Sequence, residues 1–301
     1  MLQLNRLKKI FKSGREIRGY RLGLALGGGG VRGMAHLGVL SVFQREGIPL
    51  HALAGSSMGA IVAAAYALNP DYGGQHLIEL LRELDDAIPE RLKTPAENSD
   101  SLLTKLKQFI NLERFILDTV SGWSVLPENL AKESLEKLTL NKKIEDAVVP
   151  IAIVSVDLLS GEKVVFKEGS SAMALQASSA IPGYLPPVEY RDMLLVDGAI
   201  VDVVPADVVR EMGVDIVIAV DVDQSGPRDE IKNGLDAFLR AVELCAQDNK
   251  RHHLKQADLV ICPDFGATIV TFDVSKTEVC INAGIKAAER ALPELEKLLR
   301  K

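Results

Sequence analysis

From residue 22 onward, the hydrophobic pattern predicts a strand, a glycine turn, a helix and a second strand. The apolar run 22–26 predicts a buried strand, residues 31–46 show helical spacing, and residues 50–54 predict another buried strand. Elements in this order form a βαβ unit, whose two strands run parallel. Residues 58–68 are apolar nearly all round, which predicts a helix that is buried on most sides.

The strand pattern returns after residue 148 and then alternates with helical segments. The expected strands are 149–156, 163–166, 193–196, 216–220 and 259–261, and the expected helices are 170–179, 205–212, 230–250 and 276–300. This alternation predicts an α/β protein of three layers, α/β/α, with a mainly parallel central sheet.

Between these two parts, residues 71–140 have the pattern of helices separated by polar stretches. We interpret them as a helical insertion in a domain that covers residues 21–301. Such helices more often extend a core than cover a site, and a lid is the alternative. The apolar residues at helical spacing are Leu102, Leu103, Leu106, Phe109 and Ile110, and Trp123 lies further along.

Charge is distributed unevenly along the chain. The 301 residues carry a net charge of -6, yet residues 1–21 contain seven basic residues and one acidic residue. An acidic remainder argues against nucleic acid as a partner, because it would repel phosphates. In the leader, residues 1–20, apolar side chains recur at helical spacing, which predicts a short interfacial helix for anionic lipid; a disordered or domain-packed basic arm is the alternative. These side chains are Leu4, Leu7, Ile10 and Phe11.

Cysteine usage and hydropathy bear on the cellular compartment of the protein. Cys245, Cys262 and Cys280 are widely spaced and form no C-x-x-C pair, so neither a disulfide framework nor a zinc site is indicated. The longest apolar run, 58–68, is too short to span a bilayer, and no leading apolar segment with a cleavage site is present. We therefore expect a cytoplasmic protein, peripheral at the inner membrane face if the leader binds lipid.

The segment Gly55-Ser56-Ser57-Met58-Gly59 matches G-x-S-x-G and lies directly after a predicted strand and directly before a predicted helix. In that context the small flanking residues allow a sharp turn that presents the Ser57 hydroxyl as a nucleophile. The positive end of the following helix then points at the site. A tight turn with Ser56 as a helix cap is the plainer alternative.

The glycine tract 27–33 also follows a strand and opens a helix, so its N–H groups converge on an anion. That anion is a tetrahedral oxyanion in an acyl hydrolase, or a pyrophosphate in a dinucleotide enzyme, because the tract satisfies G-x-G-x-x-G. A dinucleotide site needs a carboxylate near the end of the next strand, where Ser57 lies instead. The oxyanion interpretation is therefore favoured. Arg32 fixes the loop or attracts a phosphate head group, unless it is a surface arginine.

A serine nucleophile needs a base, and the histidines are poor candidates. His252 and His253 lie in a polar run that is typical of a solvated helix end, and His36 has the surroundings of a core residue. His51 reads as a strand residue near the sheet edge, and His76 has no supporting context. Asp197, at the end of an apolar strand that we expect in the parallel sheet, is better placed, although it needs a desolvating pocket and the pair with Gly198 is also a common turn.

Taken together, these residues resemble the patatin-like phospholipase family, bacterial type. The likeness covers about residues 23–221 and rests on four blocks in the family's order, which is far more specific than any single motif. The blocks are Gly28-Gly29-Gly30-Val31-Arg32-Gly33, Gly55 to Gly59, Ala177 to Gly183 with Pro186-Pro187, and Asp197-Gly198-Ala199. In Asp202-Val203-Val204-Pro205 the chain departs from the family, which often has asparagine before the proline.

The resemblance implies a serine acyl hydrolase with a Ser57–Asp197 dyad that acts on phospholipids or lysophospholipids through an acyl-enzyme. It implies an oxyanion hole from Gly28, Gly29, Gly30 and Arg32, motif support from Gly33, Gly55, Gly59 and Gly198, and no metal or cofactor. The alternatives are an esterase or thioesterase on small or CoA-type substrates, a nucleotide-binding oxidoreductase, and a regulator without enzymatic activity that kept the fold.

Overall fold

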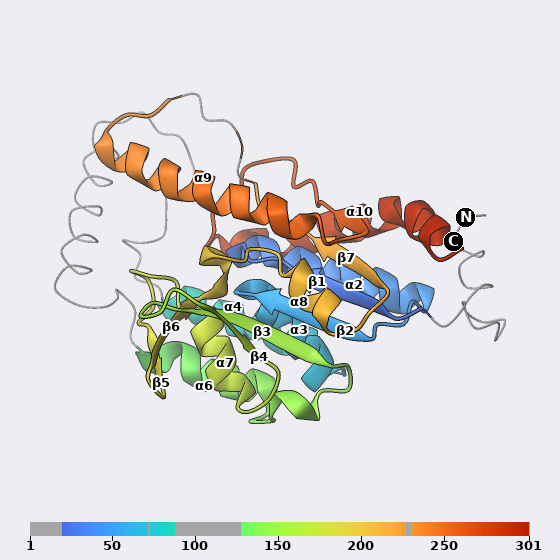
Figure 1. Cartoon of the computed structure of the whole chain (residues 1–301), viewed down its shortest axis with the longest axis horizontal. Helices are drawn as coiled ribbons and strands as arrows, with labels where there is room; N and C mark the ends of the chain where they lie inside the picture. Colours follow the sequence, from blue (N-terminus) through green and yellow to red (C-terminus); the bar gives the residue numbers. More distant parts are fainter. Residues whose placement is uncertain (1–19, 72, 88–127, 225, 227–229, 301) are drawn as a thin grey trace.

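The computed structural model describes residues 20–71, 73–87, 128–224, 226 and 230–300 (Figure 1). The described strands form one sheet in the order β5-β6-β3-β2-β1-β7-β8, with β4 also paired to β3. They are β1 (Leu22–Leu26), β2 (Ala52–Ser56), β3 (Ile151–Asp157), β4 (Lys163–Phe166), β5 (Val188–Tyr190), β6 (Met193–Asp197), β7 (Ile216–Val220) and β8 (Leu259–Ile261). The pattern did not predict β5.

Strand direction divides the sheet into two parts. The neighbours β3, β2, β1, β7 and β8 run parallel, whereas β4 and β6 run antiparallel to β3, and β5 antiparallel to β6. The predicted mainly parallel sheet is therefore confirmed, and the antiparallel strands lie at the β3 end of it.

Helices cover both faces of the sheet. They are η1 (Gly30–Met34), α2 (Ala35–Glu46), α3 (Met58–Leu68), α4 (Gly73–Ala87), α6 (Glu128–Thr139), η3 (Ile144–Asp146), α7 (Ser171–Ser178), η4 (Gly198–Ile200), α8 (Ala206–Glu211), α9 (Gly234–Leu254), η5 (Val274–Lys276) and α10 (Thr277–Leu298). In Figure 1, α8 lies in front of the sheet and α9 runs along the upper edge of the molecule.

The two faces follow from the alternation of side chains along each strand. In β1, Leu22, Leu24 and Leu26 belong to the core cluster that contains buried residues of α2, α3 and α10, whereas Ala25 belongs to a second cluster with α8. The second face is lined mostly by alanine and valine, so α8 packs close to it. The predicted three-layer α/β/α arrangement is confirmed.

The described ends of the helical insertion extend the main core. Leu77 and Leu81 of α4, with Leu135 and Leu138 of α6, are buried in the same cluster as the apolar side of α3. Residues 88–127, which include Phe109 and Trp123, lie outside the described residues, so the lid stays a prediction. The basic leader lies outside them as well, up to residue 19. In the part of the chain that is described, no helix has the length and apolarity needed to cross a bilayer.

Close backbone approach at Gly59 sets the position of α3. A Cβ on Gly59 would lie 2.0 Å from the Leu26 carbonyl oxygen at the end of β1, well inside van der Waals contact. Because that obstacle is backbone, a side chain here would push α3 away from the sheet.

We therefore predict that Gly59→Ala lowers the free energy of unfolding by more than about 2 kcal/mol, as expected for overpacking in a core. Gly234→Ala is the matched control, because nothing lies within 4 Å of a Cβ at that position, and it should change stability by less than about 0.5 kcal/mol. Urea unfolding measures both. Equal stability of the two variants would show that α3 is not held by this contact.

Candidate active site

Ser57 and Asp197 are brought together across β3. Ser56 of β2 lies beside Val154 of β3, and Asp197 of β6 lies beside Ser155, so the two residues flank the same level of one strand. The expectation that Asp197 ends a strand of the parallel part is wrong, because β6 runs antiparallel to β3. Asp197 still reaches the site, because it is the last residue of β6 and pairs with Ser155, which lies near the carboxyl end of β3.

The backbone at Ser57 makes the turn that the G-x-S-x-G motif predicts. Its φ of 54° and ψ of -127° lie in a region that non-glycine residues rarely occupy, and α3 begins at the next residue. The Ser57 N–H donates to Ser178 Oγ at 3.0 Å, and its own hydroxyl donates to Asp197 Oδ2 at 2.7 Å. Such a strained residue persists only where its surroundings fix it, and these two hydrogen bonds contribute to that.

Asp197 is a buried carboxylate with few stabilising partners. Its side chain accepts from Ser57 Oγ through Oδ2 and from the Ala199 N–H through Oδ1, at 2.7 and 2.8 Å. Burial raises the pKa of Asp197 to about 6, against the lowering effect of these two hydrogen bonds. The group is therefore a stronger base than an exposed aspartate and is still ionised at neutral pH.

The glycine tract after β1 lies beside the serine. A Cβ on Gly28 would be 3.2 Å from Ser57 Cβ, which places this loop against the serine side chain. The Gly28 N–H donates to Val203 O at 2.9 Å, so it is already engaged. The oxyanion hole stays a prediction, and within the predicted set only the N–H groups of Gly29 and Gly30 remain as glycine donors.

Arg32 fixes the glycine loop through its side chain. The Nε donates to Gly29 O at 3.1 Å, which holds the peptide between Gly29 and Gly30 with its carbonyl toward the guanidinium. In a trans peptide the N–H points opposite to the carbonyl, so Arg32 also sets the direction of the Gly30 N–H. Of the roles considered from the sequence, the structure favours loop fixation.

The five histidines have partners away from Ser57. Burial lowers the pKa of His36 to about 4, so this core residue is neutral and its Nε2–H donates to Gly27 O at 2.7 Å. The other partners are Leu22 N for His51, Asn69 for His76, Asp248 for His252, and Asp202 with Asp207 for His253. The expectation of a solvated helix end holds for His252 but is wrong for His253.

Two contacts in the site were not predicted from the motifs. Ser178 Oγ, at the end of α7, accepts from the Ser57 N–H, and Asp202 O accepts from Ser56 Oγ at 2.6 Å. Ser178 is fully buried at the end of α7, and its place in the block Ala177 to Gly183 was the available signal. The Asp202 contact uses a backbone carbonyl, which sequence patterns do not mark.

Comparison with known proteins bears on this arrangement. The family model described as patatin-like phospholipase matches residues 24–210. The chain is 31% identical over 219 residues to human patatin-like phospholipase domain-containing protein 6, and 32% identical over 209 residues to an uncharacterized NTE family protein of Mycobacterium bovis. These matches cover 72% and 69% of the chain, but only 14% and 51% of the relatives' own lengths.

Among solved structures, human GIVD cytosolic phospholipase A2 is similar in fold, with a TM-score of 0.52 and 11% sequence identity. The match covers 99% of this chain and 62% of that chain. The family model spans more than half of the sequence and includes both Ser57 and Asp197. The chain therefore belongs to the patatin-like phospholipase family.

Proposed function

We propose that this protein is a serine acyl hydrolase that cleaves fatty-acyl esters of phospholipids or lysophospholipids, with Ser57 as nucleophile and Asp197 as its base. The observation that carries the proposal is the 2.7 Å hydrogen bond from Ser57 Oγ to a buried carboxylate. A hydroxyl so held can pass its proton to the base as it attacks a carbonyl carbon. Membership of the family supports a lipid as the substrate.

The first half of the reaction forms an acyl-enzyme. Ser57 Oγ attacks the ester carbonyl carbon while its proton moves to Asp197 Oδ2, and the carbonyl oxygen becomes an oxyanion. We assign its stabilisation to the N–H groups of Gly29 and Gly30, the latter oriented by Arg32. Each preorganised donor in such a hole contributes about 2.7–4 kcal/mol.

The second half returns the enzyme to its starting state. Collapse of the tetrahedral intermediate breaks the ester bond, and the leaving alcohol takes the proton from Asp197. A water molecule then loses a proton to Asp197 as it attacks the acyl carbon. The fatty acid leaves, and the proton returns to Ser57 Oγ.

The leader, residues 1–20, bears on where the protein acts.

 Its basic and apolar residues at helical spacing favour a peripheral contact with anionic lipid, in a cytoplasmic setting. Deleting residues 1–20 and measuring binding to anionic vesicles tests this: unchanged binding would exclude the contact.

We predict that Ser57→Ala abolishes covalent labelling by a fluorophosphonate probe, because the probe forms its bond with an activated serine Oγ. Ser41→Ala is the matched control, since Ser41 is an exposed serine on α2 whose hydroxyl bonds within its own helix. It should label like the wild type. Undiminished labelling of Ser57→Ala, measured by gel fluorescence and peptide mass, would exclude Ser57 as the nucleophile.

Product analysis on the wild type addresses the leaving group. We expect free fatty acid from phospholipid or lysophospholipid vesicles at a higher kcat/KM than from an acyl-CoA or a short-chain ester. The reverse order would favour the esterase or thioesterase alternative while leaving the dyad intact.

The raised pKa of Asp197 predicts opposite effects on activity and stability. Activity should rise with pH through about 6, as the base loses its proton. The folded protein disfavours ionised Asp197, so the free energy of unfolding is lowered above about pH 6. This loss of stability disappears as the pH falls toward the pKa of the unfolded state. Asp197→Asn should therefore abolish labelling, yet raise the unfolding free energy by about 1–3 kcal/mol near pH 8 and by less near pH 5.

Urea unfolding of wild type and Asp197→Asn at the two pH values measures the stability difference. A variant that is less stable than the wild type at both would contradict the assignment of Asp197 as a desolvated carboxylate.

A further inference from the structure

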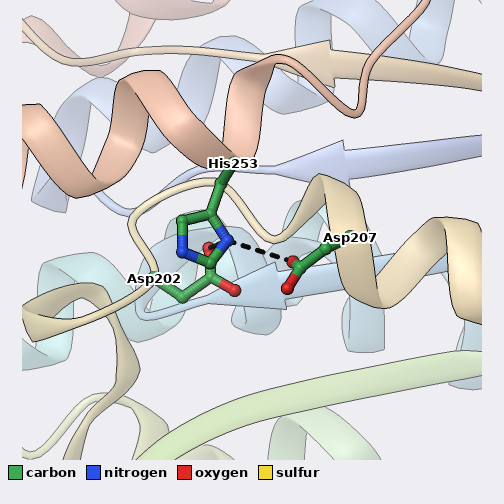
Figure 2. Close-up of side chains that lie close together, drawn as sticks. All are labelled: Asp202, Asp207 and His253. Carbon is green, nitrogen blue, oxygen red and sulfur yellow. Dashed lines mark ion pairs between the residues drawn. The ribbon is translucent and has the colours of Figure 1, made fainter.

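Four charged side chains, from β4, the segment between η4 and α8, α8 and α9, meet in one cluster. Lys163 Nζ of β4 lies 2.9 Å from Asp202 Oδ2 and 2.6 Å from Asp207 Oδ2. His253 Nδ1 of α9 lies 3.2 Å from the Oδ1 atoms of the same two carboxylates. Figure 2 shows the imidazole reaching down from α9 to Asp202, which follows η4, and to Asp207 of α8. We call these four residues the brace cluster.

The backbone at Asp202 and Val203 connects the brace cluster to three parts of the candidate active site: the serine turn, the glycine loop and the segment after Asp197. Asp202 O accepts from Ser56 Oγ, next to the nucleophile, and Val203 O accepts from the Gly28 N–H in the oxyanion loop. The Asp202 N–H donates to Gly198 O, next to Asp197, at 2.9 Å. A shift of Asp202 would therefore reach the nucleophile, the glycine loop and the base together.

The Asp202 side chain is out of contact with solvent, so water does not stabilise its charge. It is 0% exposed, so its position depends on the cations that face it. Two carboxylates and one lysine leave one uncompensated negative charge in a largely buried place, which is costly. A protonated His253 brings the brace cluster to neutrality.

We propose that His253 is a positioning residue of the active site: through its charge it holds Asp202, and thereby keeps Ser56 and Gly28 in the arrangement that the reaction needs. The proposal rests on the proposed acyl-hydrolase function. It assigns no contact with substrate to His253, which acts through the backbone at Asp202 and Val203.

The electrostatic surroundings of His253 favour its charged form. The adjacent Asp207 carboxylate, 3.2 Å away, and the charge of Asp202 raise the pKa of His253 against the opposing effects of burial and of Lys163. On its own helix, Lys250 is occupied by Asp221 and Asp223, each at 2.9 Å. As pH rises through its raised pKa, His253 loses the proton and Asp202 loses this partner.

The same atoms have the composition of a cation site, since Asp202, Asp207 and His253 each offer one ligand atom within 4.8 Å of the others. The Lys163 ammonium, however, already contacts both carboxylates and supplies positive charge there. We therefore assign the brace cluster to ion pairing, and a metal requirement becomes an outcome of the test.

The test compares His253→Gln with His252→Gln, its neighbour in the sequence. Glutamine removes the charge but keeps a polar side chain, and His252 is the matched control because its side chain is 65% exposed, against 22% for His253. The measurement is the rate at which a fluorophosphonate labels Ser57 between about pH 5 and about pH 9, corrected for the folded fraction. Wild type and His252→Gln should give bell-shaped profiles.

His253→Gln should react about tenfold more slowly near neutral pH, as expected when catalytic groups are displaced, and should lack the descending alkaline limb. Its rate relative to wild type should therefore recover as pH rises. A constant ratio across the pH range would overturn the proposal, because a general loss of structure has no such pH dependence.

Two further outcomes have separate meanings. Loss of wild-type labelling on chelator treatment that added Zn²⁺ restores would replace ion pairing with a metal site. A wild type that does not label at Ser57 at any pH would contradict the proposed function, whereas labelling with identical profiles for both glutamine variants would contradict only the role of His253.

Discussion

The hydrogen bond from Ser57 to Asp197 is the contact on which the proposed chemistry depends, and the fold makes it possible across a single strand. Because β2 and β6 both pair with β3, their ends meet at one level of the sheet although they run in opposite directions. The same burial that brings the carboxylate to the serine removes water from it and raises its pKa. In the proposed function this carboxylate takes the role of the base for which many serine hydrolases use histidine.

The glycine loop and the segment after Asp197 form a second layer of constraint around that bond. Gly28 donates to Val203 O, Arg32 orients the Gly29 carbonyl, and Ser56 donates to Asp202 O. The contacts of Gly28 and Ser56 link segments that are far apart in the sequence, whereas that of Arg32 is local, and all three use a backbone carbonyl as the acceptor. The positions of Gly28 and Ser56 therefore depend on main-chain carbonyls of the segment after Asp197, and so on what holds that segment in place.

Much of the fold was predictable from the sequence because its pattern is strong. The run 58–68 is apolar on all sides, and it forms α3 with the same bounds. β5 was missed because three residues beside a proline pair carry too little alternation to identify a strand. The direction of β6 was also hidden, because its continuous apolar run is typical of a buried parallel strand, whereas β6 runs antiparallel to β3.

For the site, the motifs identified the residues whose chemistry is local, namely Ser57 with its turn and Asp197 with Gly198. They could not identify partners that the fold brings from a distance. His253 follows another histidine in a polar run, and only the packing of α9 against α8 gives it two carboxylates as partners. The partner of Gly28 was hidden for the same reason, because its N–H donates to Val203 O, more than a hundred residues away in the sequence.

The central claim is that an acyl group passes through Ser57 Oγ. Its most direct measurement is rapid acid quenching of the wild-type protein during turnover of a phospholipid, followed by peptide mass analysis. We predict a fatty-acyl adduct on the peptide that contains Ser57, and none on that peptide in Ser57→Ala. Release of fatty acid by the wild type at a comparable rate, with the adduct absent or on another residue, would contradict the account.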